Sequence, residues 1–221
     1  MNISKIKEFK GRYRFLSNFY LTPVIIDGMQ FRSAEHAYMS FKSNNKDWKL
    51  KCMSTDIPPG QIKKLSKDIV LVEHWDKNKT HTMEKVIWAK FQSQLMKEQL
   101  LETGDAIIEE GNEWNDRFWG VDLKTGIGEN NLGIILMKTR DKLRTIENLV
   151  QAFKYMITTT VDSRYDTVLE CLNECLNNFF PEKSDLRIHT LEKLKENFVN
   201  ESNIAKLISN EILTIKIKDG Y

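Results

Sequence analysis

The sequence predicts a mainly α fold with a small β-hairpin, built as one multihelical domain plus a helical C-terminal extension. Apolar residues recur at helical spacing through much of the 221-residue chain. Only one clear hairpin signal interrupts them, Asp27-Gly28 between two short β-favouring runs. All five tryptophans and nine of the ten glycines lie in residues 1–150, whereas 151–221 has the pattern of three helical segments. We therefore expect a domain at 1–150 and an extension at 151–221.

The first expected elements are the hairpin and a helix that follows it directly. The β-favouring residues on either side of Asp27-Gly28 place the hairpin at about 22–32. Ser33 is a plausible N-cap, because its hydroxyl accepts a hydrogen bond from the free amides of a first helical turn. The helix then runs through Lys42.

Three further helices complete the expected domain. One lies near 60–67, and a long one spans roughly 80–102, where helical apolar spacing ends at Gly104. The last covers 131–143, with Asn130 or Asn131 as its cap.

The extension has an apolar face on its first helical segment, formed by Val168, Leu169, Leu172, Leu176 and Phe179. Such a face packs back onto the first domain, as a lid or buttress, or pairs with another chain; we expect the first. The ending LTIKIKDGY alternates, which is typical of a short strand or a frayed tail.

Composition is that of a soluble globular protein, with 41% hydrophobic and 29% charged residues. No apolar run approaches the ~20 residues of a membrane span, and the first residues lack the apolar core of a signal peptide. Three cysteines without a CxxC pair indicate a reducing, cytoplasmic setting. The net charge of +2 does not by itself indicate a nucleic-acid partner.

The first candidate site is a stripe along the helix that follows Ser33. Glu35, Tyr38, Met39 and Lys42 stand at i, i+3, i+4 and i+7, so they share one helical face. A carboxylate, a phenol and an ammonium on one face indicate either an ordinary half-exposed surface helix or one wall of a polar site.

The second candidate is the glycine-rich stretch before residue 131. Gly126, Gly128 and Gly133 bracket a helix start, whose free amides suit a phosphate, although their spacing matches neither the dinucleotide-binding pattern nor the P-loop. Trp114 and Trp119 in the same region are either core residues or stacking surfaces for a flat ring. The histidines show no metal-ligand spacing, so we expect neither a metal nor a cofactor.

An ordered set of motifs covers about residues 9–144 and resembles the NADAR family, the YbiA-like proteins. The matching stretches are Leu16-Ser17-Asn18-Phe19, Asp27-Gly28, Ser33 to Lys42, Trp75, Met83 with Lys90-Phe91, Thr103-Gly104, Glu110, Asp116 to Gly120, and Gly128 through Gly133 to Arg140. Two features depart from the family pattern and bear on substrate fit. Met39 stands where glutamine is usual, and the loop before Asp116 is longer.

The resemblance implies an N-glycosidase that cleaves the bond between a nitrogen and C1 of a phosphorylated ribose. Relatives are linked to phosphoribosyl-amine intermediates of riboflavin synthesis and to removal of ADP-ribose from guanine. The implied catalytic residues are Glu35, to stabilise a sugar cation or act as acid/base, and Lys42, to hold phosphate or attack C1. The implied substrate-binding residues are Asn18, Phe19, His36, Tyr38, Lys90, Asp116, Trp119, Gly120 and Asn130, with Lys90 as the rival catalytic lysine.

The sequence is compatible with three functions. The substrate is a ribosylated small molecule or an ADP-ribosylated nucleic acid, and the latter requires a continuous basic groove. The third is a binding module for NAD or ADP-ribose without turnover. We expect no membrane partner, and the oligomeric state stays open.

Overall fold

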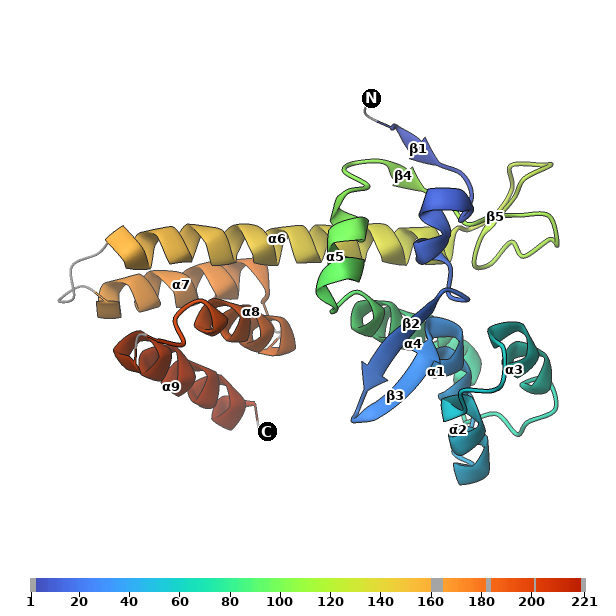
Figure 1. Ribbon diagram of the computed structural model, residues 1–221, viewed down its shortest axis with the longest axis horizontal. Coiled ribbons are helices and arrows are strands. Elements are labelled where there is room, and N and C mark those ends of the chain that lie inside the picture. Colours follow the sequence, from blue (N-terminus) through green and yellow to red (C-terminus); the bar gives the residue numbers. More distant parts are fainter. Residues whose placement is uncertain (1–2, 160–164, 182–183, 201, 220–221) are drawn as a thin grey trace. The chain divides into compact units, whose positions relative to one another are not determined.

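The computed structural model describes residues 3–159, 165–181, 184–200 and 202–219 (Figure 1). The chain divides into two compact units, residues 1–143 and 144–221. Helices dominate both units, so the mainly α fold expected from the sequence is confirmed. Every sheet in the described residues has only two strands.

The first unit contains most of the short elements. In chain order these are β1 (Lys5–Ile6), the 3-10 helix η1 (Gly11–Leu16), β2 (Leu21–Ile26), β3 (Met29–Ser33), α1 (Ala34–Ser40), α2 (Lys46–Met53), α3 (Pro59–Leu65), α4 (Trp75–Lys90), α5 (Gln94–Leu101), β4 (Ile107–Ile108), β5 (Gly111–Asn112), β6 (Val121–Asp122) and the start of α6 (Asn131–Thr159).

The expected hairpin is present as β2 and β3, which pair antiparallel. Asp27 and Gly28 form its turn with φ of 52° and 74°. Two successive positive φ values give the backbone twist that matches two tightly connected strands, which is why Asp-Gly is favoured there. The hairpin leads directly into α1 (Figure 1).

Helix α1 is the buried centre of the first unit. Ser33 caps it as expected, since its Oγ accepts from the His36 amide. All seven residues of the helix are buried, because α2, α3, α4 and the hairpin pack around it. The polar stripe predicted along α1 therefore does not belong to a half-exposed surface helix.

The prediction of one long helix at 80–102 is wrong in one respect. This stretch forms two helices, α4 and α5, separated at residues 91–93. The break changes which apolar residues face the core. Leu95 would follow Phe91 on one face of a continuous helix, but it is 63% exposed, whereas Met96 and Leu100 are buried. Helix α2, in which Trp48 and Cys52 are buried, was not expected.

Two parallel strand pairs occur in the first unit, and the first of them joins segments far apart in the sequence. β1 pairs with β4, and β5 pairs with β6. Arg140 of α6 is almost fully buried and donates to Thr103 Oγ1 and the Ala106 carbonyl, which fixes the segment that leads into β4.

The second unit consists of the remainder of α6 with α7 (Tyr165–Phe179), α8 (Ser184–Glu196) and α9 (Ser202–Lys218). Leu172 and Leu176 of the expected apolar face are buried, whereas Phe179 is exposed and Phe180 is buried in its place. The side chains of Val168 and Leu169 lie outside the described residues.

The C-terminal stretch is helical through Lys218, which corrects the expected strand or frayed tail; Gly220 and Tyr221 lie outside the described residues. None of the helices in the described part of the chain has the length and apolar character that crossing a membrane requires.

Candidate active site

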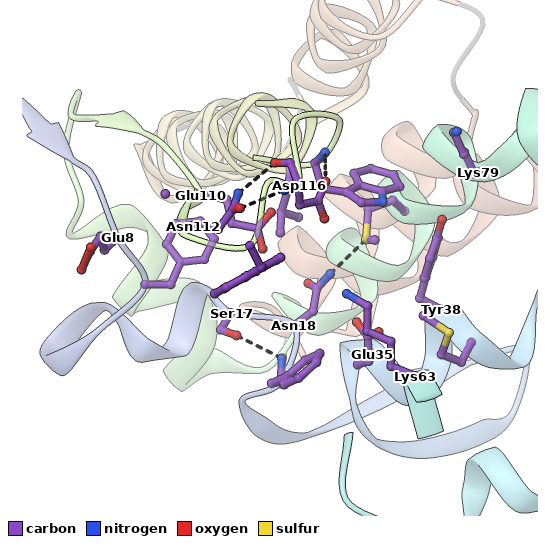
Figure 2. A pocket seen from close by; sticks show the side chains of 18 of the residues that line it. Glu8, Ser17, Asn18, Glu35, Tyr38, Lys63, Lys79, Glu110, Asn112 and Asp116 are labelled. Carbon is purple, nitrogen blue, oxygen red and sulfur yellow. Dashed lines mark hydrogen bonds between the residues drawn. The ribbon is translucent and has the colours of Figure 1, made fainter. Parts of the chain in front are cut away.

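A cavity of about 530 Å³ lies within the first unit. Its lining comes from segments far apart in the sequence: the chain around η1, helices α1, α3 and α4, the loop at 110–123, and the start of α6. Figure 2 shows the labelled side chains from these segments gathered around it. The volume is in the range typical of small-ligand pockets.

The whole α1 stripe faces this cavity. Glu35, Tyr38, Met39 and Lys42 all line it. Helical spacing of three and four residues explains how one short helix supplies four neighbouring side chains. The polar face of α1 is therefore a wall of the cavity.

Glu35 is the most buried acidic group of that wall, with 4% of its surface exposed. Its amide donates to the Asn18 carbonyl at 2.9 Å, which fixes the start of α1 against the loop after η1. No donor in the described residues reaches its Oε1. Burial raises the pKa of Glu35 to about 7, while Lys63 and Lys42 lower it.

Lysines 42 and 63 place positive charge on the same side of the cavity as Glu35. Lys42 follows α1, and burial lowers its pKa, whereas Glu35 raises it. Lys63 belongs to α3, and its Nζ lies 5.7 Å from the centre of the Phe19 ring. Two ammonium groups beside a carboxyl suit an anionic ligand that also carries a cationic or hydroxyl-bearing part.

An aromatic wall stands next to these charges. Tyr38 contacts Trp75 and Trp119, with ring centres 5.2 and 5.7 Å apart. Lys42 Nζ lies 5.8 Å from the Trp75 ring centre. Trp114 also lines the cavity but is 70% exposed, so it presents a free ring face at the rim. Such surfaces suit a flat base.

Asn18 and Phe19, both expected in the site, also line the cavity. Asn18 is buried; its Nδ2 lies 3.4 Å from the Met83 sulfur, and no described residue donates to its Oδ1. An amide oxygen of this kind is suited to a ligand hydroxyl.

Asp116 is held at the cavity by its own loop. The side chain of Asn112 binds both backbone groups of Asp116: its Nδ2 donates to the Asp116 carbonyl, and its Oδ1 accepts from the Asp116 amide. The Asp116 carboxylate in turn accepts from the Trp119 amide. The loop thus fixes an acid and a tryptophan together.

Two expected site residues lie elsewhere. The ring of His36 is buried between Ser33 Oγ, 2.7 Å from Nδ1, and the Ile57 carbonyl, 2.9 Å from Nε2. Lys90 is fully buried, and its Nζ donates to the carbonyls of Leu16 and Ser17. Neither lines the cavity, and both hold neighbouring segments in place.

Asn130 and Gly120 also lie behind the cavity wall. Asn130 has φ of 54°; its Oδ1 accepts from the Glu110 amide and its Nδ2 donates to the Ile108 carbonyl. A Cβ on Gly120 would stand 2.1 Å from the Glu110 carbonyl oxygen, so only glycine permits that approach. Both residues help to fix the position of Glu110.

The glycine-rich helix start is not arranged as an anion site. The amides of Asn131 and Leu132 donate to the carbonyls of Phe118 and Trp119. A Cβ on Gly128 or Gly133 would stand 2.1 or 2.2 Å from a backbone oxygen. These glycines permit close backbone packing, and the start of α6 reaches the cavity through Leu132.

The cavity residues that sequence reasoning did not assign to the site include Lys63 and Glu110. Lys63 is one of two adjacent lysines on α3, and nothing local distinguishes it. Glu110 already belonged to the motif set but received no role. In the described residues no three metal-binding side chains gather.

Comparison with known proteins gives concordant results. The pattern of the NADAR domain matches residues 6–144. The N-glycosidases YbiA of Escherichia coli (strain K12) and Shigella boydii are each 29% identical over 134 residues, covering 59% of this chain and 82% of theirs. The NMR structure of E. coli YbiA matches with a TM-score of 0.59 and 29% identity, over 66% of this chain and 89% of that one.

Proposed function

This chain belongs to the NADAR family, and on that premise we propose that it is an N-glycosidase acting on a nitrogen-linked, phosphorylated ribose. The reaction breaks the bond between C1 of the sugar and the nitrogen of a base or amine, and water supplies the new C1 hydroxyl. The YbiA relatives, described as N-glycosidases, support this activity.

The observation that carries the proposal is the buried Glu35 carboxyl on the α1 wall of the cavity. Departure of the nitrogen leaves positive charge on C1 and the ring oxygen of the sugar. A carboxylate in a water-poor pocket stabilises that charge more strongly than one in water. Lys42 and Lys63, which lower the pKa of Glu35, favour its ionised form.

The other cavity groups suit the remaining parts of such a substrate. Asn18 Oδ1 accepts from a ribose hydroxyl, and the lysines hold the 5′-phosphate. Lys42 also suits a second role, because an amine whose pKa is lowered by burial is a nucleophile toward C1. The aromatic wall and Trp114 offer faces to the base.

Substrate identity is tested by incubating the protein with two classes of compound. One class is ribosylaminopyrimidine 5-phosphates of riboflavin synthesis, and the other is ADP-ribosylated guanine in an oligonucleotide. Released base and sugar phosphate are quantified by chromatography and mass spectrometry, with Glu35→Gln as the control. We expect base release by the wild type from one class. Tight binding of NAD or ADP-ribose without release from either class would support a binding module instead.

A further inference from the structure

Three buried acceptor atoms in the cavity have no donor among the described residues: Asn18 Oδ1, Glu35 Oε1 and Glu110 Oε2. A buried, unpaired acceptor is costly, and a carboxyl oxygen relieves the cost by holding a proton or by receiving a donor from a ligand. The proposed reaction uses Glu35 and Asn18. Glu110, a half-buried residue whose Oε2 is buried, is the one of the three to which the reaction assigns no role.

The backbone around Glu110 is held from several sides. Its amide donates to Asn130 Oδ1 at 3.1 Å, and its carbonyl accepts from the Val121 amide at 2.9 Å. Gly120 leaves room for that carbonyl. Such constraints fix the direction of a side chain, which is what a reacting group requires and a solvent-facing acid does not.

The neighbouring residue shows the contrast. Glu109 precedes Glu110 and makes an ion pair with Lys5, with 2.6 Å between Oε1 and Nζ. Glu109 does not line the cavity, whereas Glu110 does (Figure 2). Two adjacent glutamates thus have different surroundings, and only the second faces the candidate substrate.

Burial raises the pKa of each of the two cavity glutamates to about 7, but the charges that act on them differ in order of strength. Burial and then Asp116 raise the pKa of Glu110 to about 7; Lys63 lowers it and Glu35 raises it. For Glu35 the strongest effects after burial are those of Lys63 and Lys42, which lower its pKa. Two carboxyls that share a buried site resist ionising together. Lys63 and Asp116 act on both carboxyls, but the lysines are the stronger influence at Glu35 and Asp116 is the stronger influence at Glu110, so a proton shared by the pair favours Glu110.

From this geometry we infer that Glu110 is a second catalytic carboxyl, the acid that protonates the departing nitrogen. The inference rests on the proposed N-glycosidase function. The proton of Glu110 passes to the nitrogen as the C1–N bond breaks, and the bonding electron pair leaves with the base. Glu35 carboxylate faces the resulting sugar cation. A water molecule then adds to C1 and gives its proton to the Glu110 carboxylate, which restores the starting state.

The test compares Glu110→Gln with Glu109→Gln on two substrates. One is an N-ribosyl compound whose base needs a proton to leave. The other is 4-nitrophenyl β-ribofuranoside 5-phosphate, whose phenolate leaves unaided. For Glu110→Gln we expect kcat on the N-riboside to fall by ~10²–10⁴-fold at similar KM, and kcat on the nitrophenyl compound to fall by less than ~10-fold. Glu109→Gln should match the wild type on both.

The pH profile and a second variant complete the test. The alkaline limb of the kcat profile should disappear in Glu110→Gln and persist, at reduced rate, in Glu110→Asp, which keeps an acid. Thermal unfolding identifies any variant that fails to fold. If Glu110→Gln does not fold, Glu110→Asp is compared with the wild type on the two substrates instead. Wild-type kcat in Glu110→Gln, or equal losses on both substrates, would overturn this role while leaving the N-glycosidase function in place. A wild type that cleaves no N-riboside would overturn the function itself.

Discussion

Substitution of Asn130 distinguishes a residue that binds substrate from one that supports the cavity wall. Its side chain makes two hydrogen bonds, to the Glu110 amide at 3.1 Å and the Ile108 carbonyl at 2.8 Å. Its φ of 54° lies in the left-handed region, which asparagine tolerates better than alanine. Asn130→Ala removes both bonds and leaves a strained backbone.

The expected magnitude follows from these three contributions. Two hydrogen bonds of about 1 kcal/mol each are lost, and alanine at positive φ costs about 1 kcal/mol more. We expect the free energy of unfolding to fall by about 3 kcal/mol in Asn130→Ala. Asn130→Gly loses the same bonds without the side-chain strain, so its loss should be smaller by up to about 1 kcal/mol.

Urea denaturation followed by tryptophan fluorescence measures the free energy of unfolding of the first structural unit. All five tryptophans lie between residues 48 and 119, so the signal reports on the first unit. Because Asn130 holds Glu110, kcat of the folded variants should fall as well. Unchanged stability together with a raised KM would refute this account and make Asn130 a substrate-binding residue, as the family resemblance implied.

Three further substitutions test separate parts of the site. Glu35→Gln should lower kcat by ~10²-fold or more at near-normal KM, since it removes the charge facing the sugar cation; full activity would contradict its role. Borohydride should trap a sugar adduct on the wild type but not on Lys42→Ala. If neither protein gives an adduct and Lys42→Ala has a raised KM, Lys42 binds phosphate and does not attack C1. Lys90→Met should lower the free energy of unfolding by about 2 kcal/mol, because the carbonyls of Leu16 and Ser17 lose their donor. Burial lowers the pKa of Lys90 to about 7, so the unfolded chain binds more protons above that pH. Wild-type stability should then rise from about pH 7 to 10, a slope absent in Lys90→Met; equal slopes in urea titrations would contradict this.

Local sequence signals predicted the elements whose cause is itself local. The Asp27-Gly28 turn and the Ser33 cap depend on residues next to them in the chain, and both are where the sequence placed them. The break between α4 and α5 has no glycine or proline to mark it. Phe91 and Leu95 even suit one continuous apolar face, so periodicity alone could not reveal that Leu95 is exposed.

The residues of the candidate site also differ in whether their placement depends on local or distant partners. The α1 stripe was visible because helical spacing alone brings its four side chains together. The positions of Lys90 and Asn130 depend on partners 74 and 20 residues away, and no local pattern reveals which backbone groups they bind. For the same reason Glu110 stood in the motif set without a role: only the packing of Gly120 and Asn130 beside it shows that it faces the cavity.

The cavity has walls drawn from nearly the full length of the first unit, from Glu8 to Leu132. Such a binding site does not survive the unfolding of any large part of that unit, so its ligands bind the native chain far better than the unfolded one. Mass action then couples occupancy to thermal stability: a ligand at 100 times its Kd adds about 2.7 kcal/mol to the free energy of unfolding. Melting curves recorded with ribose phosphates, free bases and ADP-ribose would therefore rank these compounds by affinity without any turnover, including in catalytically dead variants.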